Sequence, residues 1–198
     1  MADGPRLGVF GGTFDPVHNG HLVAAVSARH ALGLDTVLMV PAREPWQKKD
    51  RALAPSEDRF AMLEAAVEGV DGLEVSRLEL DRSGPTYTAD TLEELSRRQP
   101  RPELFLIVGA DAARDLATWD RPEAIRTLAV LVIVSRGAAT DTGGPGAGWR
   151  TEHVRIPALE ISSTDLRRRA AAGEPLEGLM PLGAVRCLRE RGLYPDPG

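Results

Sequence analysis

Two histidines follow a pair of glycines near the start of the chain, in GVFGGTFDPVHNGHL, residues 8–22. Gly11 and Gly12 lack a Cβ, so a ligand can approach their backbone closely. His18 and His21 have the i, i+3 spacing that places both on one face of a helix entrance. Their imidazoles can donate hydrogen bonds to a phosphate, and a helix N-terminus adds N–H groups and a positive dipole end. The segment therefore predicts a phosphate-binding turn.

Two other interpretations of this segment stay open on the residues alone. The glycines can simply form a tight turn, with one histidine capping the helix that follows. Asp15, His18 and His21 are also ligand types that zinc accepts, although no other ligand cluster in the sequence supports a zinc site. The segment matches neither GxxxxGK[ST] nor GxGxxG, which excludes two familiar phosphate loops.

A second group of phosphate-binding residue types occurs in ISSTDLRRR, residues 161–169. Its hydroxyl side chains stand at a predicted helix start, and Arg167 follows one turn later. Hydroxyls, unpaired N–H groups and a guanidinium fork suit a terminal phosphate. An ordinary helix N-cap followed by exposed arginines is the alternative, and the residues alone favour that alternative.

Further basic residues follow predicted strands. Lys48 and Lys49, the only lysines, lie in VPAREPWQKKD, residues 40–50, and Arg136 directly follows a later apolar run. Ligands of parallel sheets bind at the carboxyl ends of the strands, so these residues are candidates for binding phosphate. A lysine in a solvated loop is the alternative interpretation for both lysines.

Apolar, β-branched runs alternate along the chain with helical patterns. This alternation predicts an α/β fold, with a parallel sheet of about five to six strands and helices on both faces. No repeat or linker stands out, so we expect one domain, residues 1–198. The predicted strands are 6–10, 36–40, 73–80 (with a bulge), 104–108, 130–134 and 153–156. The predicted helices are 20–32, 56–68 with Ser56 as N-cap, 88–98, 122–128, 163–173 and 181–192.

Composition limits the classes of protein that the chain can belong to. The 198 residues are 42% hydrophobic and 27% charged, which suits a globular core. A net charge of −5 argues against nucleic acid as a general partner. No apolar stretch is long enough to span a membrane, so we expect no membrane partner. The single cysteine, Cys187, excludes a disulfide framework, and we expect a cytoplasmic protein.

The segment GGTFDPVHNGH resembles the GxFDPxHxGH signature of the nucleotidyltransferase superfamily, and ISSTDLR resembles its ISSTxxR signature. The resemblance implies a Rossmann-like nucleotidyltransferase fold, ATP as a substrate, and Mg²⁺ carried with the ATP rather than held by protein ligands. It implies catalytic roles for His18, His21, Lys48 and Arg167. It implies ATP-phosphate contacts for Gly11, Gly12, Thr13, Phe14, Ser162, Ser163 and Thr164, with Arg136 as a weaker candidate.

Three residues suggest which acceptor receives the nucleotidyl group. Thr86 lies in GPTYTADTL, residues 84–92, and Asp111 and Trp119 lie in VGADAARDLATW, residues 108–119. An indole can stack on a flat pyridine ring, and backbone N–H groups near Thr86 and Asp120 suit a carboxylate. Trp119 can instead be a core residue, and Asp111 can instead cap a helix.

With these residues the chain resembles the bacterial nicotinate-nucleotide adenylyltransferases from Leu7 to Tyr194. The resemblance implies that ATP and nicotinate mononucleotide give nicotinate adenine dinucleotide and pyrophosphate. The acidic residues Asp120 and Glu44 depart from the family's pattern at these positions.

Other functions remain to be separated from this one. The runner-up is adenylylation of nicotinamide mononucleotide or phosphopantetheine. A nucleotide sensor without chemistry would not need the two histidines together with Lys48 and Arg167, and a metal-dependent hydrolase would use the histidine pair. The sequence leaves open whether the chain forms a homo-oligomer, how strongly it prefers nicotinate, and what the glycine-rich loop 137–149 does.

Overall fold

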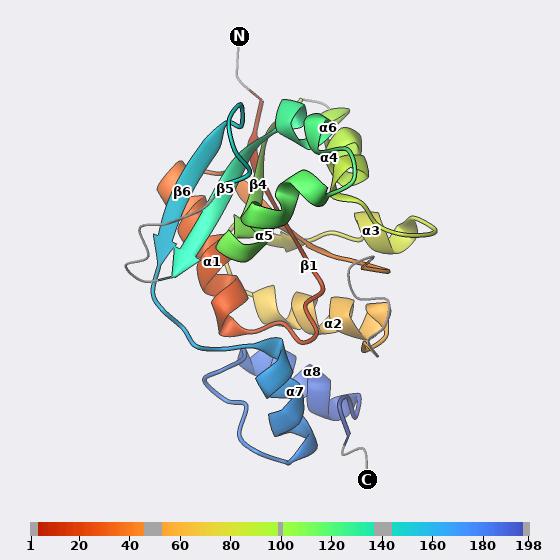
Figure 1. Ribbon diagram of the computed structural model, residues 1–198. Helices are drawn as coiled ribbons and strands as arrows, with labels where there is room; N and C mark the ends of the chain where they lie inside the picture. The colour runs from red at the N-terminus through yellow and green to blue at the C-terminus, as the bar shows by residue number, and fades with distance from the viewer. Residues whose placement is uncertain (1–3, 46–52, 99–100, 137–143, 196–198) are drawn as a thin grey trace. The chain divides into compact units, whose positions relative to one another are not determined.

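A computed structural model describes residues 4–45, 53–98, 101–136 and 144–195 of the chain. Within these residues, six strands form one sheet in the order β3-β2-β1-β4-β5-β6 (Figure 1). β1 pairs in parallel with β4, β4 with β5, and β5 with β6. The strands are β1 (Arg6–Gly12), β2 (Thr36–Pro41), β3 (Leu73–Val75), β4 (Glu103–Gly109), β5 (Ala129–Arg136) and β6 (Thr151–Ile156).

Helices surround this sheet, which confirms the predicted α/β, Rossmann-like nucleotidyltransferase fold. They are α1 (Asn19–Leu32), α2 (Ser56–Val67), α3 (Leu78–Asp81), α4 (Thr88–Ser96), α5 (Ala110–Asp115), the 3₁₀ helix η2 (Leu116–Thr118), α6 (Pro122–Leu128), α7 (Ser163–Ala171) and α8 (Leu182–Glu190). Within the described residues, no helix has the length and apolar character needed to cross a membrane.

The chain forms two compact units whose segments alternate along the sequence. One unit comprises residues 1–11, 23–38 and 87–158, and the other comprises residues 12–22, 39–86 and 159–198. The expectation of one domain, residues 1–198, stays a prediction.

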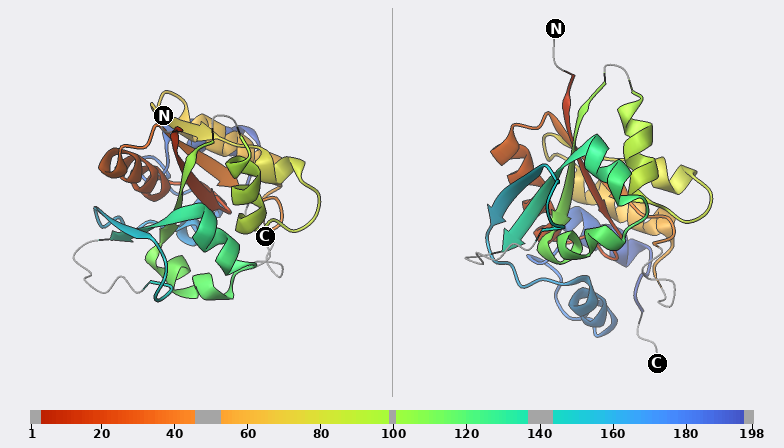
Figure 2. Two further views of the ribbon diagram at one scale, coloured as in Figure 1. Left: turned by 90° about the horizontal axis from the view of Figure 1, so that it is seen from above. Right: turned by 45° about the horizontal axis from the view of Figure 1, so that its top comes forward.

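The first unit is built on β4, β5 and β6. The runs 104–108 and 129–135 are buried throughout, as expected for parallel strands that are covered on both faces. Leu104 of β4 pairs with Ala129 of β5, and Leu131 of β5 pairs with Thr151 of β6. Figure 2 shows β5 and β6, in teal and blue, side by side from two further directions. In the same unit α4 packs against α6.

The second unit is held together by the packing of α2 against α8. α2 buries Phe60, Met62 and Leu63, and α8 buries Val185 and Leu188. The backbones of the two helices approach closely at Gly183, where an added Cβ would lie 2.1 Å from the carbonyl oxygen of Ala65. Only glycine allows this approach without a shift of one helix.

Two local predictions were wrong. The expected strand 73–80 ends at Val75, and Leu78–Asp81 forms a short helix that buries Glu79 and Leu80. The change in apolar spacing there reflects a change from strand to helix rather than a bulge. Ser56 is the first residue of α2 and not its N-cap, which is Pro55 and makes no side-chain capping bond.

The other predicted elements are confirmed, with ends that differ by at most a few residues. α5 and η2 were not predicted. The glycine-rich loop falls partly outside the described residues, and residues 144–149 form neither helix nor strand.

Candidate active site

The turn after β1 is shaped by the ring of Phe14. Phe14 is buried and has a φ of +48°, in the left-handed region that few non-glycine residues adopt. A Cβ on Gly12 would lie 2.9 Å from the Phe14 ring, so glycine is required there. The ring in turn meets His21 edge-on, with centroids 5.0 Å apart. The absence of a Cβ at Gly12 therefore makes room for the Phe14 ring, in addition to any room that it gives to a ligand.

His18 and His21 form a stacked pair at the entrance to α1. Their ring centroids are 3.8 Å apart and the ring planes differ by 24°. The backbone N–H of His18 donates to Nδ1 of His21 at 3.2 Å, which places the His21 proton on Nε2. His18 is only 4% exposed, and its ring packs so closely on Gly20 that an added Cβ would lie 3.0 Å from its Nδ1. The two imidazoles are therefore held in one arrangement by backbone and ring contacts.

Asp15 turns its carboxylate into the protein. The side chain is 3% exposed, and Oδ1 accepts hydrogen bonds from the backbone N–H of Ala54 at 3.2 Å and from the hydroxyl of Tyr194 at 2.7 Å. Among the residues that the structure describes, no group of three or more His, Cys, Asp or Glu side chains is arranged to hold a metal ion. The zinc alternative, built on Asp15 and the two histidines, has no support in this arrangement.

The start of α7 is hydrogen-bonded to the same turn. Ser163 Oγ donates to the carbonyl oxygen of Pro16 at 3.0 Å. Arg167 Nη1 donates to the carbonyl oxygen of Asp15 at 2.6 Å, and Nη2 donates to Thr164 Oγ1 at 3.3 Å. Two segments that lie far apart in the sequence, both singled out for phosphate binding, thus meet within the second unit.

Ser162 has the structural role that the alternative interpretation gave it. Its hydroxyl accepts a hydrogen bond from the backbone N–H of Asp165 at 3.1 Å, so it is the N-cap of α7. The cap satisfies one of the N–H groups in the first turn of α7.

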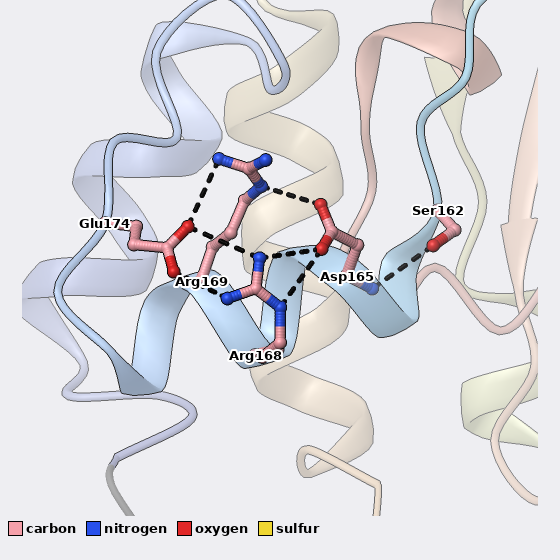
Figure 3. A network of polar contacts seen from close by, with 5 residues as sticks. All are labelled: Ser162, Asp165, Arg168, Arg169 and Glu174. Carbon is pink, nitrogen blue, oxygen red and sulfur yellow. Dashed lines mark hydrogen bonds and ion pairs between the residues drawn. The ribbon is translucent and has the colours of Figure 1, made fainter.

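The two arginines after Arg167 belong to a separate surface network (Figure 3). Arg168 Nη1 lies 2.5 Å from Glu174, and Arg169 Nε lies 2.6 Å from Asp165. Arg168 Nη2 also donates to Asp165 at 2.9 Å, and the hydrogen bonds from Arg169 and then from Arg168 lower the pKa of the Asp165 carboxyl. Arg168 and Arg169 therefore pair with acidic side chains around α7, as expected for surface residues, whereas Arg167 contacts the turn.

Arg59, which the sequence analysis did not select, is the most buried charged side chain beside the turn. It is 1% exposed and donates to three carbonyl oxygens: Nη1 to Thr13 at 2.8 Å, Nε to Ala54 at 3.0 Å and Nη2 to Arg43 at 3.1 Å. Burial lowers the pKa of Arg59, and the nearby Asp15 opposes that shift. A guanidinium stays protonated in proteins, so Arg59 is a buried cation satisfied by backbone oxygens.

Thr86 also belongs to the second unit. It is buried, its hydroxyl donates to the carbonyl oxygen of Glu44 at 3.5 Å, and it forms an isolated bridge with Pro45. Glu44 thus meets Thr86 through its backbone, and its side chain is exposed. Lys48 and Lys49 lie outside the described residues.

In the first unit, Trp119 follows η2 with a half-buried side chain. Its indole Nε1 is buried and has no hydrogen-bond acceptor among the described residues. Asp120 directs its carboxylate to Arg121, at 2.9 Å from Nε. The same guanidinium also pairs with Asp90 and Glu93, so Asp120 shares one cation with two other carboxylates.

Asp111 and Arg136 are more exposed. The Asp111 side chain is 94% exposed and pairs with Arg114 inside α5, where the N-cap is Gly109, so Asp111 does not cap the helix. Arg136 ends β5 and is exposed.

Comparison with known proteins places the chain in a family. The cytidylyltransferase-like family model matches residues 9–169. A protein of Corynebacterium kroppenstedtii is 45% identical over 196 residues, covering 98% of this chain and 93% of its own. A protein of Streptomyces coelicolor is 46% identical over 186 residues, covering 93% and 98%. Both carry the name probable nicotinate-nucleotide adenylyltransferase.

A solved structure has the same fold. The nicotinic acid mononucleotide adenylyltransferase of Plasmodium falciparum, complexed with NaAD, superimposes with a TM-score of 0.74 at 18% identity, covering 96% of this chain and 97% of that one. At this identity the likeness establishes the fold, while the family follows from the sequence matches. This chain belongs to the cytidylyltransferase-like family and, within it, to the nicotinate-nucleotide adenylyltransferases.

Proposed function

We propose that the turn 11–21 and the start of α7 together bind the triphosphate of ATP. The observation that carries this proposal is the pair of hydrogen bonds from Ser163 to Pro16 and from Arg167 to Asp15, which join the two segments. The chain is a nucleotidyltransferase that transfers the adenylyl group of ATP to nicotinate mononucleotide, a step in NAD synthesis.

The chemistry asks the protein to position two anions and to offset their charge. A phosphate oxygen of nicotinate mononucleotide attacks the α-phosphorus of ATP, a new P–O bond forms, and the bond to the β-phosphate oxygen breaks. Pyrophosphate leaves with that electron pair. The attacking oxygen is already ionised at neutral pH, so the reaction needs neither a general base nor a covalent intermediate. Donors that bind the charge spreading over the phosphates supply the catalysis.

The described residues offer these donors in the second unit. His21, with its proton on Nε2, and the stacked His18 are suited to donate to phosphate oxygens. Arg167 uses two of its five N–H groups in the hydrogen bonds found among the described residues, so the others can bind phosphate. The backbone of residues 12–14, Ser163 and Thr164 completes this set. Lys48 and Arg136 are proposed as further contacts.

Magnesium enters this proposal as part of the substrate MgATP. As part of the substrate, the ion would offset phosphate charge and would not need a set of protein carboxylates. The one acidic side chain in the turn, Asp15, is committed to Ala54 and Tyr194.

For the pyridine nucleotide we propose Thr86, Asp111 and Trp119. The indole Nε1 of Trp119 is buried and has no acceptor among the described residues, whereas a buried indole N–H normally has one. This observation supports a ligand contact at Trp119. We propose the cytoplasm as the location of the reaction, a compartment that suits a chain with one cysteine.

Replacing Trp119 by alanine is expected to raise KM for nicotinate mononucleotide about tenfold, because base–aromatic stacking contributes about 1–3 kcal/mol. KM for ATP should stay unchanged. Steady-state kinetics with each substrate varied in turn measure both constants. Trp119→Phe keeps an aromatic face and serves as the matched control, with a smaller rise. Equal changes of KM for both substrates would contradict stacking on the pyridine.

The function itself is tested by pyrophosphate release from MgATP with a panel of acceptors. Nicotinate mononucleotide should give the fastest release, ahead of nicotinamide mononucleotide and phosphopantetheine, and no release is expected without an acceptor. Release without an acceptor would indicate a hydrolase. Nucleotide binding with no release for any acceptor would indicate a sensor.

A further inference from the structure

The chain after α8 returns to the turn that carries the two histidines. α8 ends at Glu190, and Gly192 and Tyr194 then adopt φ values of +59° and +56°. The left-handed conformation is uncommon for a tyrosine and persists where surrounding contacts hold it. Here the contact is the hydrogen bond from the Tyr194 hydroxyl to Asp15 Oδ1, at 2.7 Å across 179 positions of sequence.

Asp15 accepts hydrogen bonds from three residues that are distant from it in the sequence. Its main-chain carbonyl accepts from Arg167 at 2.6 Å, and its carboxylate accepts from Ala54 and Tyr194. The second carboxylate oxygen lies 3.6 Å from Arg167 Nη1 and makes no hydrogen bond among the described residues. A buried carboxylate depends on the donors that remain, so the loss of one leaves it poorly compensated.

These contacts link the hydroxyl of Tyr194 to Asp15, which lies in the same turn as the imidazole pair. Asp15 directly follows Phe14, whose ring meets His21, and the His21 ring stacks on His18. Because these rings are packed on one another, we expect a shift of Asp15 to displace the imidazoles.

We infer that Tyr194 is a positioning residue for adenylyl transfer, which holds the His18–His21 turn in its productive arrangement through Asp15. This inference rests on the proposed function. Tyr194 lies outside both phosphate-binding segments, and we assign it no contact with either substrate. The hydroxyl group makes this contribution, so the variant that tests it should remove the hydroxyl and keep the ring.

The first test is the kinetics of Tyr194→Phe. We expect kcat to fall about tenfold, because small misplacement of catalytic groups is costly, with KM for nicotinate mononucleotide unchanged. Arg191→Gln is the matched control. Arg191 tethers the same C-terminal segment to Asp58, at 2.5 Å, but does not contact the turn, so this variant should keep its kcat. An equal loss in both variants would mean that general detachment of the segment, rather than the Tyr194 hydroxyl, lowers the rate.

A double-mutant cycle with Asp15→Ala, which removes the acceptor that asparagine would keep, tests whether the effect passes through Asp15. If it does, Tyr194→Phe should lower kcat much less in the Asp15→Ala background than in the unmodified chain. The inference would be overturned if Tyr194→Phe kept its kcat, or if the double variant lost kcat by the product of the two single-variant factors. An unmodified chain that is inactive with every acceptor would instead count against the proposed function.

A spectroscopic titration checks the contact without any assay of activity. Burial raises the pKa of Tyr194, and the hydrogen bond to Asp15 raises it further. With Tyr87 replaced by phenylalanine, tyrosinate absorbance reports Tyr194 alone, since the chain has two tyrosines. Tyr194 should stay un-ionised at pH values where an exposed tyrosine ionises, and Asp15→Asn should let it ionise at lower pH, compared over the pH range in which circular dichroism shows both chains folded. A titration that stays in place would show that the two side chains do not interact.

Discussion

Replacing His18 or His21 by alanine is expected to lower kcat by about 10²-fold or more, the scale of losing one donor to a charged transition state. Each imidazole is held by the other, through ring stacking at 3.8 Å and through the hydrogen bond from the His18 backbone to His21 Nδ1. Removing His21 deletes its Nε2 donor and also releases one face of His18. We therefore expect the double variant to lose little more than the worse single variant.

Pyrophosphate release under saturating substrates gives kcat for each histidine variant. His30→Ala is the matched control, because His30 is exposed in the last turn of α1 and has no part in the turn. Its kcat should equal that of the unmodified chain. Near-normal kcat in both His18→Ala and His21→Ala would remove these residues from a catalytic role. A change confined to KM for ATP would mean that the histidines bind ATP equally well in the ground state and in the transition state, and so do not accelerate the chemical step.

Sequence patterns predicted the parts of the fold in which burial and periodicity coincide. β4 and β5 are continuous apolar runs, because parallel strands are covered on both faces, and they were predicted to within two residues. The segment 73–80 failed because its apolar residues fit a strand with a bulge as well as they fit a strand followed by a helix. Short apolar spacings do not separate these cases.

The candidate site was predictable where its residues are close in sequence. The i, i+3 spacing of His18 and His21 was enough to bring their rings together. The meeting of Arg167 with Asp15 was not a matter of spacing, because it depends on how α7 packs within the second unit. Tyr194 carries no local signal at all, since only the tertiary structure brings it to Asp15.

Arg59 did carry a signal that was overlooked. It stands one helical turn before Leu63 on the face of α2 that is otherwise apolar and buried. A charged residue in phase with buried positions indicates a buried, paired charge. Its partners are backbone carbonyls, which no sequence pattern identifies, so the position was predictable and the contacts were not.

Replacing Arg59 by methionine is expected to lower the free energy of unfolding by about 3 kcal/mol or more, since an unsatisfied buried polar group costs about 1–3 kcal/mol. The variant leaves the carbonyls of Thr13, Arg43 and Ala54 without their donor. Methionine keeps much of the volume, so the loss measures hydrogen bonds rather than a cavity. For a chain of this size the midpoint of thermal unfolding should fall by about 2–4 °C for each kcal/mol of unfolding free energy that is lost.

Denaturant and thermal unfolding measure this loss, and Arg97→Met is the matched control. Arg97 is 76% exposed and lies 3.9 Å from Glu93, an arrangement in which ion pairs contribute about 0–1 kcal/mol. Arg59→Lys should recover part of the loss at most, because one ammonium cannot reproduce a planar fork that reaches three carbonyls. If Arg59→Met unfolds at the same midpoint as Arg97→Met, the buried guanidinium does not stabilise the turn. If Arg59→Met is destabilised as expected, Arg59 of α2 stabilises the backbone at Thr13, and the turn proposed to bind phosphate depends on a residue outside it.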